Sequence, residues 1–255
     1  MTLLHLPGIS LQDLSAASSL QARQDRKYIV DNDLLAQLVQ ALAGEVAVLE
    51  VDGVRSSRYA TRYYDTPHLL TARHHAQGVR RRFKARTRTY IDSGLVRLEL
   101  KGKGRGGQTV KYALDGAAPG LDARGRTFLR QSLDDCYGAG YLPAVVDGLA
   151  PTLDMTCRRT TLVGMAEQVR VTADRDLQFG QLALRPDLVV LEVKSAGPRT
   201  RVDRLLLGLG ARPTSFSKYV AAVELTCPGA VLRAHPTRLL ERCFTRDDVD
   251  LQKAV

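Results

Sequence analysis

Basic side chains recur at every second position along several segments, and this spacing is suited to binding phosphate. In a β-strand, residues i, i+2 and i+4 lie on the same face. The longest such face would be made up of Arg80, Arg82, Lys84, Arg86, Arg88 and Tyr90. A guanidinium group presents parallel N–H donors that match two phosphate oxygens. A strand of this kind could therefore hold a chain of phosphates.

Acidic residues alternate with basic ones in three further segments. Their shared faces carry Arg97, Glu99, Lys101 and Lys103, then Arg170, Thr172 and Asp174, and then Glu192 and Lys194. The charged face of a half-buried strand normally points to water, which is the simplest interpretation of any one segment. Repetition of the pattern, with basic residues in excess, instead favours a curled sheet whose charged faces point inward. Such a lining is costly unless an anion and a metal fill it.

Composition limits the classes of molecule that the protein is expected to bind. The chain has 255 residues, a formal net charge of +10 and 44% hydrophobic residues, so it can bury a core and attract nucleic acid, an anionic membrane or a phosphate-rich small molecule. Nucleic acid is the least expected of these, because aromatic residues for stacking bases are only 5% of the chain. No apolar run approaches the length of a membrane span, and the four cysteines lack zinc spacing. We expect a cytoplasmic protein without a transmembrane segment.

Hydrophobic periodicity and capping residues place the elements that would carry these side chains. Helices are expected over residues 31–43, 122–137, 199–209 and 215–225, and strands over 59–64, 79–90, 95–101, 108–114, 152–163, 168–174 and 188–194. No Pro- or Ser-rich linker divides the chain. We expect a lead-in over 1–22, one main domain over 23–226 and a polar tail over 227–255.

Eight short motifs with charged or aromatic residues follow one another along the chain. They are RQDRKY at 23–28, YYDTP at 63–67, KARTRTY at 84–90, LELK at 98–101, RR at 158–159, RVTAD at 170–174, LEVK at 191–194 and FSKY at 216–219. Each motif alone is weak, but eight in order make a specific signal. In this order they resemble the motifs of the VTC domain, the polyphosphate polymerase branch of the triphosphate tunnel metalloenzyme (CYTH-like) superfamily, over about residues 23–225.

The resemblance implies an α+β fold, with about eight antiparallel strands closed into a tunnel or barrel and helices outside. It implies transfer of the γ-phosphoryl group of ATP to polyphosphate with Mn²⁺ or Mg²⁺. By position, the phosphate-binding residues would be Lys27, Arg86, Arg88, Lys101, Arg159, Arg170 and Lys218, and alternation adds Lys84, Lys111 and Lys194. Glu192 would be the main metal ligand, and Lys27, Arg86 and Arg88 would share the catalytic role with it. Glu99 and Asp174 would either bind metal or orient the basic residues.

At two positions this chain differs from the related hydrolases, and these differences bear on whether we expect synthesis or hydrolysis. Hydrolytic tunnel enzymes open with E-x-E-x-K, whereas this chain has Arg23 at the first acidic position and the shorter Asp25 at the second. Loss of an acid that serves metal or water activation favours synthesis over hydrolysis. An inorganic or nucleoside triphosphatase, and a non-catalytic polyphosphate-binding module, remain the alternatives.

Overall fold

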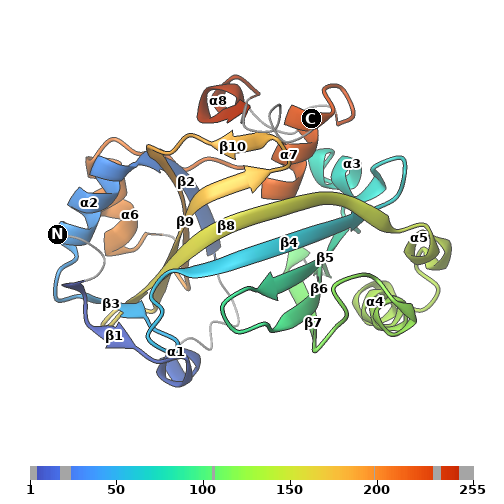
Figure 1. Ribbon diagram of the computed structural model, residues 1–255, viewed down its shortest axis with the longest axis horizontal. Coiled ribbons are helices and arrows are strands. Elements are labelled where there is room, and N and C mark those ends of the chain that lie inside the picture. The colour runs from blue at the N-terminus through green and yellow to red at the C-terminus, as the bar shows by residue number, and fades with distance from the viewer. Residues whose placement is uncertain (1–4, 18–23, 105–106, 198, 232–236, 247–255) are drawn as a thin grey trace, which may run out of the picture. The chain divides into compact units, whose positions relative to one another are not determined.

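The computed structural model describes residues 5–17, 24–104, 107–197, 199–231 and 237–246 (Figure 1). The strands are β1 (Gly8–Ile9), β2 (Gln24–Asp31), β3 (Val46–Leu49), β4 (Ser57–Asp65), β5 (Phe83–Tyr90), β6 (Val96–Lys103), β7 (Thr109–Asp115), β8 (Ala150–Gly164), β9 (Val169–Phe179), β10 (Leu182–Leu184), β11 (Leu188–Ser195) and β12 (Phe244–Arg246). The helices are α1 (Leu11–Ala17), α2 (Asn32–Ala41), α3 (Leu70–Ala76), α4 (Ala123–Tyr137), α5 (Pro143–Asp147), α6 (Arg201–Gly208), α7 (Lys218–Thr226) and α8 (Thr237–Cys243).

The α+β class and its antiparallel sheet are confirmed. The eight strands of seven or more residues follow one hydrogen-bonded order, β2-β11-β9-β8-β4-β5-β6-β7. The other four strands have two to four residues each and add to this order, which brings the sheet to 12 strands. Among the named strands of the described residues, β2 pairs only with β11, and β7 is left at the other end, so the strand order is open rather than closed. Outside these strands, the Thr214 amide donates to the Lys27 carbonyl of β2 at 2.7 Å. None of the described helices is long and apolar enough to cross a membrane.

The chain divides into two compact units. The first consists of Met1–Arg58, Cys157–Leu177 and Leu184–Ser215, and the second of Tyr59–Thr156, Gln178–Ala183 and Phe216–Val255. Each unit contains a set of strands with one apolar face and one charged face, and each is considered below by itself.

In the first unit, β11 lies between β2 and β9 and is antiparallel to both. Alternate residues of β11, such as Leu191 and Val193, are fully buried in a core that α2 and α6 complete. Figure 1 shows these two helices side by side next to β2. The start of α2 is set by Asp31, whose carboxylate accepts a hydrogen bond from the Leu34 amide at 2.7 Å. Glu192 and Lys194 consequently project from the opposite face of the sheet.

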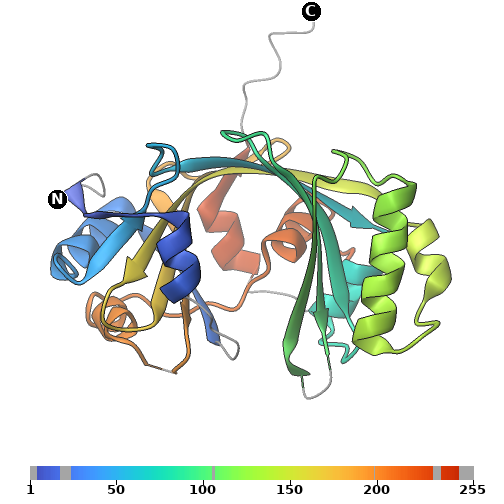
Figure 2. The same ribbon diagram turned by 90° about the horizontal axis from the view of Figure 1, so that it is seen from below.

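In the second unit, β4, β5, β6 and β7 form an antiparallel set in chain order. Their apolar face packs against α4, which lies alongside β5–β7 in Figure 2. Leu98 and Leu100 of β6 and Leu129 and Leu133 of α4 are at most 1% exposed in this core. Asp122 caps α4 by accepting the Gly125 amide at 2.7 Å. The basic residues of β5 and β6 therefore occupy the other face.

The strand expected over residues 79–90 begins later than the alternation suggested, because β5 starts at Phe83. The hydroxyl of Tyr141 donates to the carbonyl of Arg81 at 2.6 Å, and that of Tyr137 donates to the carbonyl of Arg82 at 2.5 Å. The Arg82 carbonyl also accepts from the Lys103 amide at 3.1 Å, so backbone pairing continues at Arg82 although the tyrosines bind the backbone just before β5. Arg80 and Arg82 precede β5 and do not extend the basic strand face. The chain after residue 226 is also more structured than a tail, since it contains α8 and β12, which lies beside β10.

Candidate phosphate and metal site

The charged face of the first unit brings together residues far apart in the sequence. Glu192 lies directly opposite Lys27 on β2 and Thr172 on β9. One step along, Lys194 lies opposite Asp25 and Arg170. Directly opposite residues of antiparallel strands project from the same face with their Cβ atoms about 5 Å apart. Two adjacent rows of three residues therefore carry three basic side chains around Glu192.

Glu192 and Lys194 contact each other within this face. The Lys194 ammonium is 3.2 Å from a Glu192 carboxylate oxygen, and their side chains are 13% and 14% exposed, respectively. Burial lowers the pKa of Lys194 to about 8, although the charge of Glu192 opposes the shift. Arg159 and Arg170 push the pKa of Lys194 in the same direction as burial. The face thus has more positive charge than its carboxylates balance, and a bound anion would relieve the repulsion.

Asp174 orients Arg159 on the same face. The Arg159 guanidinium donates two hydrogen bonds to the Asp174 carboxylate, at 2.6 and 2.8 Å, and Asp174 is fully buried. Burial by itself would lower the pKa of Arg159, but the charge of Asp174 and its hydrogen bonds, together with the charge of Glu192, outweigh burial and raise the pKa well above its usual value. These contacts favour the orienting role predicted for Asp174 over metal binding.

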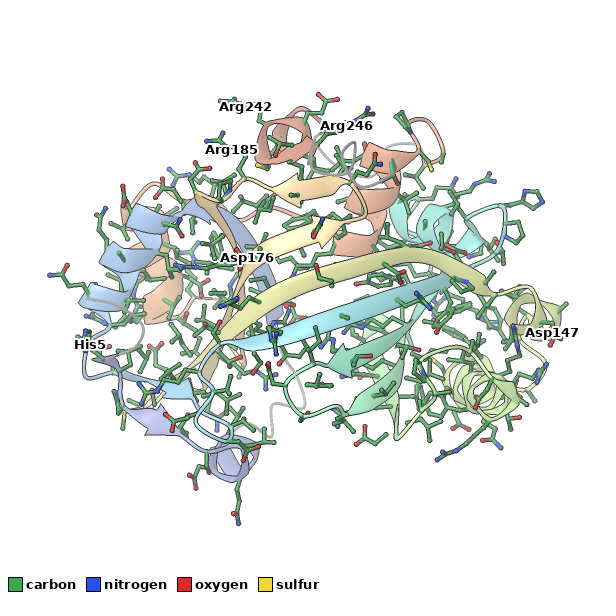
Figure 3. The ribbon with its side chains drawn as sticks, viewed as in Figure 1. His5, Asp147, Asp176, Arg185, Arg242 and Arg246 are labelled. Carbon is green, nitrogen blue, oxygen red and sulfur yellow. The ribbon has the colours of Figure 1, made fainter. Side chains whose placement is uncertain are left out.

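The neighbouring Arg158 points the other way, as the expected alternation requires. Its side chain is 55% exposed and lies 3.5 Å from Asp176, which is labelled in Figure 3. Asp176 is itself 69% exposed. Arg159 rather than Arg158 therefore belongs to the charged face.

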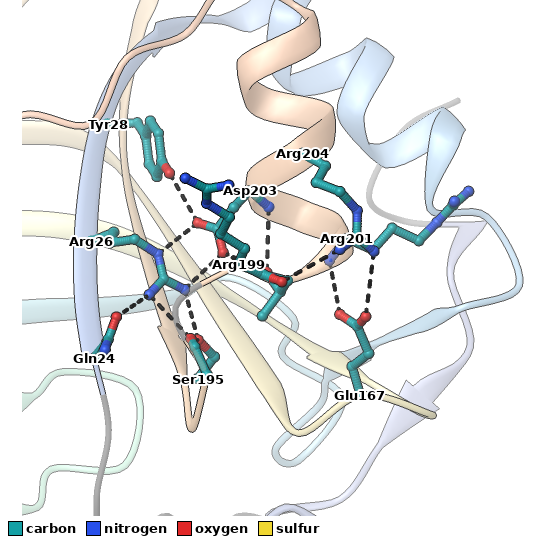
Figure 4. Close-up of polar contacts among 11 residues, drawn as sticks. Gln24, Arg26, Tyr28, Glu167, Ser195, Arg199, Arg201, Asp203 and Arg204 are labelled. Atoms are coloured by element: carbon teal, nitrogen blue, oxygen red, sulfur yellow. Dashed lines mark hydrogen bonds and ion pairs between the residues drawn. The ribbon is translucent and has the colours of Figure 1, made fainter.

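A buried network on the opposite side of β2 holds this strand against α6. Arg26 donates to both carboxylate oxygens of Asp203 at 2.7 Å, and the Tyr28 hydroxyl donates to Asp203 at 2.9 Å (Figure 4). Burial and the adjacent Asp203 carboxylate raise the pKa of Tyr28 to about 12. Asp203 also forms a reciprocal capping box with Thr200 at the start of α6. Because Arg26 and Tyr28 flank Lys27, the network fixes the backbone that carries Lys27.

The charged face of the second unit is organised around Glu99, whose side chain is 2% exposed. Arg86 lies directly opposite on β5 and donates to Glu99 at 2.6 Å, and the Lys111 ammonium of β7 contacts the other carboxylate oxygen. Burial alone would raise the pKa of Glu99, but the charges of Arg86, Arg88 and Lys111 together hold it well below its usual range. Glu99, like Asp174, orients basic side chains.

Three lysines lie side by side across the same strands. Lys84 of β5 is opposite Lys101 of β6, and Lys101 is opposite Lys111 of β7. Like charges placed directly opposite each other destabilise a sheet. This row is therefore suited to an anion that bridges the lysines. The Lys84 ammonium also donates to the Ser217 hydroxyl at 2.9 Å, just before Lys218 begins α7.

Tyrosines next to the basic residues were not singled out by the sequence. The Tyr63 hydroxyl accepts from Arg86 at 3.4 Å, and the Arg86 guanidinium lies 6.0 Å from the Tyr63 ring centroid. Arg88, only 8% exposed, lies over the Tyr59 ring at 5.4 Å. Tyr63 belongs to the YYDTP motif, so the sequence did mark this segment. The spacing of the motif, however, predicted no functional role for Tyr63. Arg23 lies outside the described residues.

The carboxylates fit a metal that receives few ligands from the protein. In the described part of the chain, no three His, Cys, Asp or Glu residues are grouped as a metal cluster. Glu99 and Asp174 are already bound by cations. Glu192 also lies 3.2 Å from the Lys194 ammonium, but its side chain retains 14% exposure among the basic side chains of this face. Its hard oxygens suit Mg²⁺ or Mn²⁺, whose other ligands would be phosphate oxygens and water.

Several solved structures are similar to this chain. A putative adenylyl cyclase from Hippeastrum, described as having a dominant triphosphatase activity, matches with 15% identity and a TM-score of 0.52, over 80% of this chain and 95% of that one. Putative adenylate cyclases from Vibrio parahaemolyticus (16% identity, TM-score 0.45, 78% and 97% covered) and Bacillus halodurans (12%, 0.44, 77% and 94%) also match. No curated protein matches the sequence. The VTC domain model matches residues 22–227, and the chain belongs to the VTC domain family.

Proposed function

We propose that this protein is an ATP-dependent polyphosphate polymerase. Membership of the VTC domain family supports a phosphotransfer or triphosphatase role with a divalent metal cofactor. The observation that carries the finer proposal is the pair of rows in which Lys27, Arg170 and Lys194 surround Glu192. The same rows also contain Asp25. Two carboxylates among three cations suit a metal–triphosphate complex, in which phosphate oxygens supply most of the metal ligands.

The basic side chains would do the electrostatic work of phosphoryl transfer. A terminal oxygen of polyphosphate attacks the γ-phosphorus of ATP, a new P–O bond forms, and the bond to the β–γ bridging oxygen breaks so that ADP leaves with the electron pair. Lys27, Arg159 and Arg170 would neutralise the phosphate oxygens and hold them in line. Glu192 would hold the Mg²⁺ or Mn²⁺ ion, which when bound shares the negative charge of the β- and γ-phosphates.

The second unit carries a proposed phosphate-binding set of its own. Its lysine row and the two arginines held by Glu99, Tyr63 and Tyr59 are all cationic groups with defined orientations. Orientation before binding reduces the entropy lost when phosphates are bound. We include Lys84, Arg86, Arg88, Lys101, Lys111 and Lys218 in the proposed phosphate-binding set. A cytoplasmic location, with access to ATP, is part of the same proposal.

The test is a chain-extension assay. Purified protein is incubated with ATP, Mn²⁺ or Mg²⁺ and a short polyphosphate primer, and the products are separated on a gel. We expect ladders of longer polyphosphate together with stoichiometric ADP. Glu192→Gln should abolish extension while leaving the fold intact. Asp187→Asn, which changes an exposed carboxylate at the entry to the same strand, should extend chains normally.

The other outcomes identify the alternatives. Release of orthophosphate from ATP or tripolyphosphate with no chain growth would contradict the proposal and indicate a triphosphatase, the activity described for the Hippeastrum protein. Tight, salt-sensitive binding of polyphosphate with neither extension nor hydrolysis would indicate a binding module.

A further inference from the structure

A fully buried aspartate at the end of β4 gathers an unusual number of hydrogen bonds. Asp65 is 0% exposed and accepts from the backbone amides of Thr66, Thr71 and Ala72 at 2.7, 2.8 and 2.9 Å. It also accepts from the Thr71 hydroxyl at 2.7 Å and from the Tyr219 hydroxyl at 2.6 Å. Four of these five bonds cap the start of α3 or the turn before it. The fifth reaches α7, 154 residues away in the sequence.

Tyr219 is the second part of this arrangement and is itself 1% exposed. Burial, together with the negative charge of Asp65, raises the pKa of Tyr219 far above its usual value, so it remains a hydrogen-bond donor. Its ring stacks on Tyr63 with centroids 4.8 Å apart and an interplanar angle of 22°. Tyr63 in turn contacts Arg86 through its hydroxyl and its ring face. A continuous chain of contacts thus joins Asp65 to Arg86.

The same bond also places the start of α7. Tyr219 is the second residue of that helix, directly after Lys218. The preceding residue, Ser217, is 7% exposed and accepts a hydrogen bond from Lys84 of β5 at 2.9 Å. Ser217 makes no side-chain capping hydrogen bond to α7. The start of the helix is therefore located by Tyr219 on one side and by the Lys84–Ser217 bond on the other.

We propose that Asp65 and Tyr219 are positioning residues for phosphate binding: their hydrogen bond sets Ser217 and Lys218 against Lys84 and, through the stacked Tyr63, the direction of the Arg86 guanidinium. The inference rests on the proposed function, because it assigns these basic side chains to phosphate. Neither Asp65 nor Tyr219 contacts the substrate. Loss of their bond would let the helix start and the tyrosine stack shift, so the cations would have to be reordered when phosphate binds.

The test compares two buried tyrosine hydroxyls of the second unit. Tyr219→Phe removes the bond to Asp65 and keeps the aromatic ring. Tyr64→Phe is the matched control: Tyr64 is also 0% exposed, and its hydroxyl contacts Thr87 at 2.9 Å on the apolar side. Each change should lower stability, because Tyr219→Phe removes the hydrogen bond to Asp65, and Tyr64→Phe removes the contact with the Thr87 hydroxyl and a hydrogen bond of 3.3 Å to the Pro119 carbonyl. Binding of inorganic tripolyphosphate with Mg²⁺ is measured by calorimetry, and urea unfolding is measured in parallel.

We expect Tyr219→Phe to weaken tripolyphosphate binding by about fivefold to tenfold, and Tyr64→Phe to leave it unchanged. Equal binding by Tyr219→Phe and the unmodified protein, or equal weakening by both variants, would overturn the inference. Lack of tripolyphosphate binding by the unmodified protein would also overturn it. Because this readout is binding, failure of chain extension alone rejects the polymerase proposal and leaves the positioning result intact.

A second variant covers the case in which Tyr219→Phe does not fold. Ser217→Ala removes the hydroxyl that holds Lys84 and retains the Asp65–Tyr219 bond. It should weaken tripolyphosphate binding by about twofold to fivefold with little change in stability. Unchanged binding by Ser217→Ala would contradict the proposed placement of Lys84 by the helix start.

Discussion

The Arg159–Asp174 pair tests how strongly burial affects the contribution of an ion pair to stability on the charged face of the first unit. Asp174 is 0% exposed and the Arg159 side chain is 15% exposed, and two hydrogen bonds of 2.6 and 2.8 Å join them. Arg185 and Asp187 form a pair of similar bidentate geometry in the same unit, at 3.0 and 2.6 Å, but are 46% and 50% exposed. Arg185, labelled in Figure 3, points away from the ribbon. The two pairs differ mainly in their access to water.

The expected magnitudes follow from that difference. Asp174→Asn leaves the Arg159 guanidinium buried without a compensating charge, which typically costs about 3–5 kcal/mol. The remaining amide oxygen still accepts one hydrogen bond, so we expect about 3 kcal/mol. Asp187→Asn leaves a guanidinium that water solvates, and exposed pairs contribute only about 0–1 kcal/mol. The two substitutions should therefore differ by roughly 2–3 kcal/mol in the free energy of unfolding.

The assay is urea unfolding at neutral pH, followed by far-UV circular dichroism because the chain contains no tryptophan. Adding Arg159→Met to Asp174→Asn should recover much of the lost stability, since no buried charge is then left unpaired. Equal losses for Asp174→Asn and Asp187→Asn, or no recovery in the double variant, would refute the desolvation reasoning.

Three further predictions concern other parts of the molecule. Burial raises the pKa of Asp203, but hydrogen bonds from Arg26, Thr200 and Tyr28 outweigh it and lower the pKa below its usual value. The stability that Asp203 contributes is therefore full above about pH 4 and is lost as the pH falls through the folded-state pKa. The gap in unfolding free energy between the unmodified protein and Asp203→Asn should shrink between pH 5 and about pH 3, and a constant gap would contradict this. Gly164→Ala should lower stability by about 1–3 kcal/mol, because the new Cβ would lie 2.5 Å from Val169 and 2.7 Å from the Glu167 carbonyl. Gly208→Ala lies at the end of α6, where the new Cβ would meet no described atom beyond the helix's own backbone within 4 Å, and it should raise stability slightly in the same denaturation assay. Lys101→Met should weaken tripolyphosphate binding by about twofold to fivefold without lowering stability, because it also relieves repulsion in the lysine row; unchanged affinity by calorimetry would remove Lys101 from the binding set.

Much of the architecture followed from local patterns in the sequence. Asp31 and Asp122 begin helices within one residue of the expected positions, because a short acidic side chain accepts the free amides of a first turn. Alternation also identified which side chains share a face in β6, β9 and β11, because successive residues of a strand point to opposite sides. The short helix α3 was missed. Leu69, the residue before α3, has a φ of 54° and makes no side-chain cap. The amides of Thr71 and Ala72 in the first turn of α3 instead donate to Asp65 of the preceding strand.

Tertiary structure showed which basic residues the acidic ones contact. Glu99 and Asp174 were candidates for metal ligation or for orienting cations, and the sequence did not distinguish the two. Both are buried and contact Arg86 and Arg159, respectively, which favours the orienting role. A carboxylate already paired with a buried guanidinium could bind a metal only by leaving that cation uncompensated.

The sequence by itself determined that basic and acidic side chains alternate along several strands, and the order of its motifs indicated the family. Alternation is a property of each strand by itself, so it can be recognised in the sequence without knowing which strands are adjacent. Only the tertiary structure decided which strands are adjacent: that Lys27 lies opposite Glu192, that three lysines form one row, and that Tyr219 reaches Asp65. Adjacency depends on the register of strands and on packing across long stretches of sequence, and no local pattern encodes it. The charged face was therefore predictable, whereas its internal pairing was not.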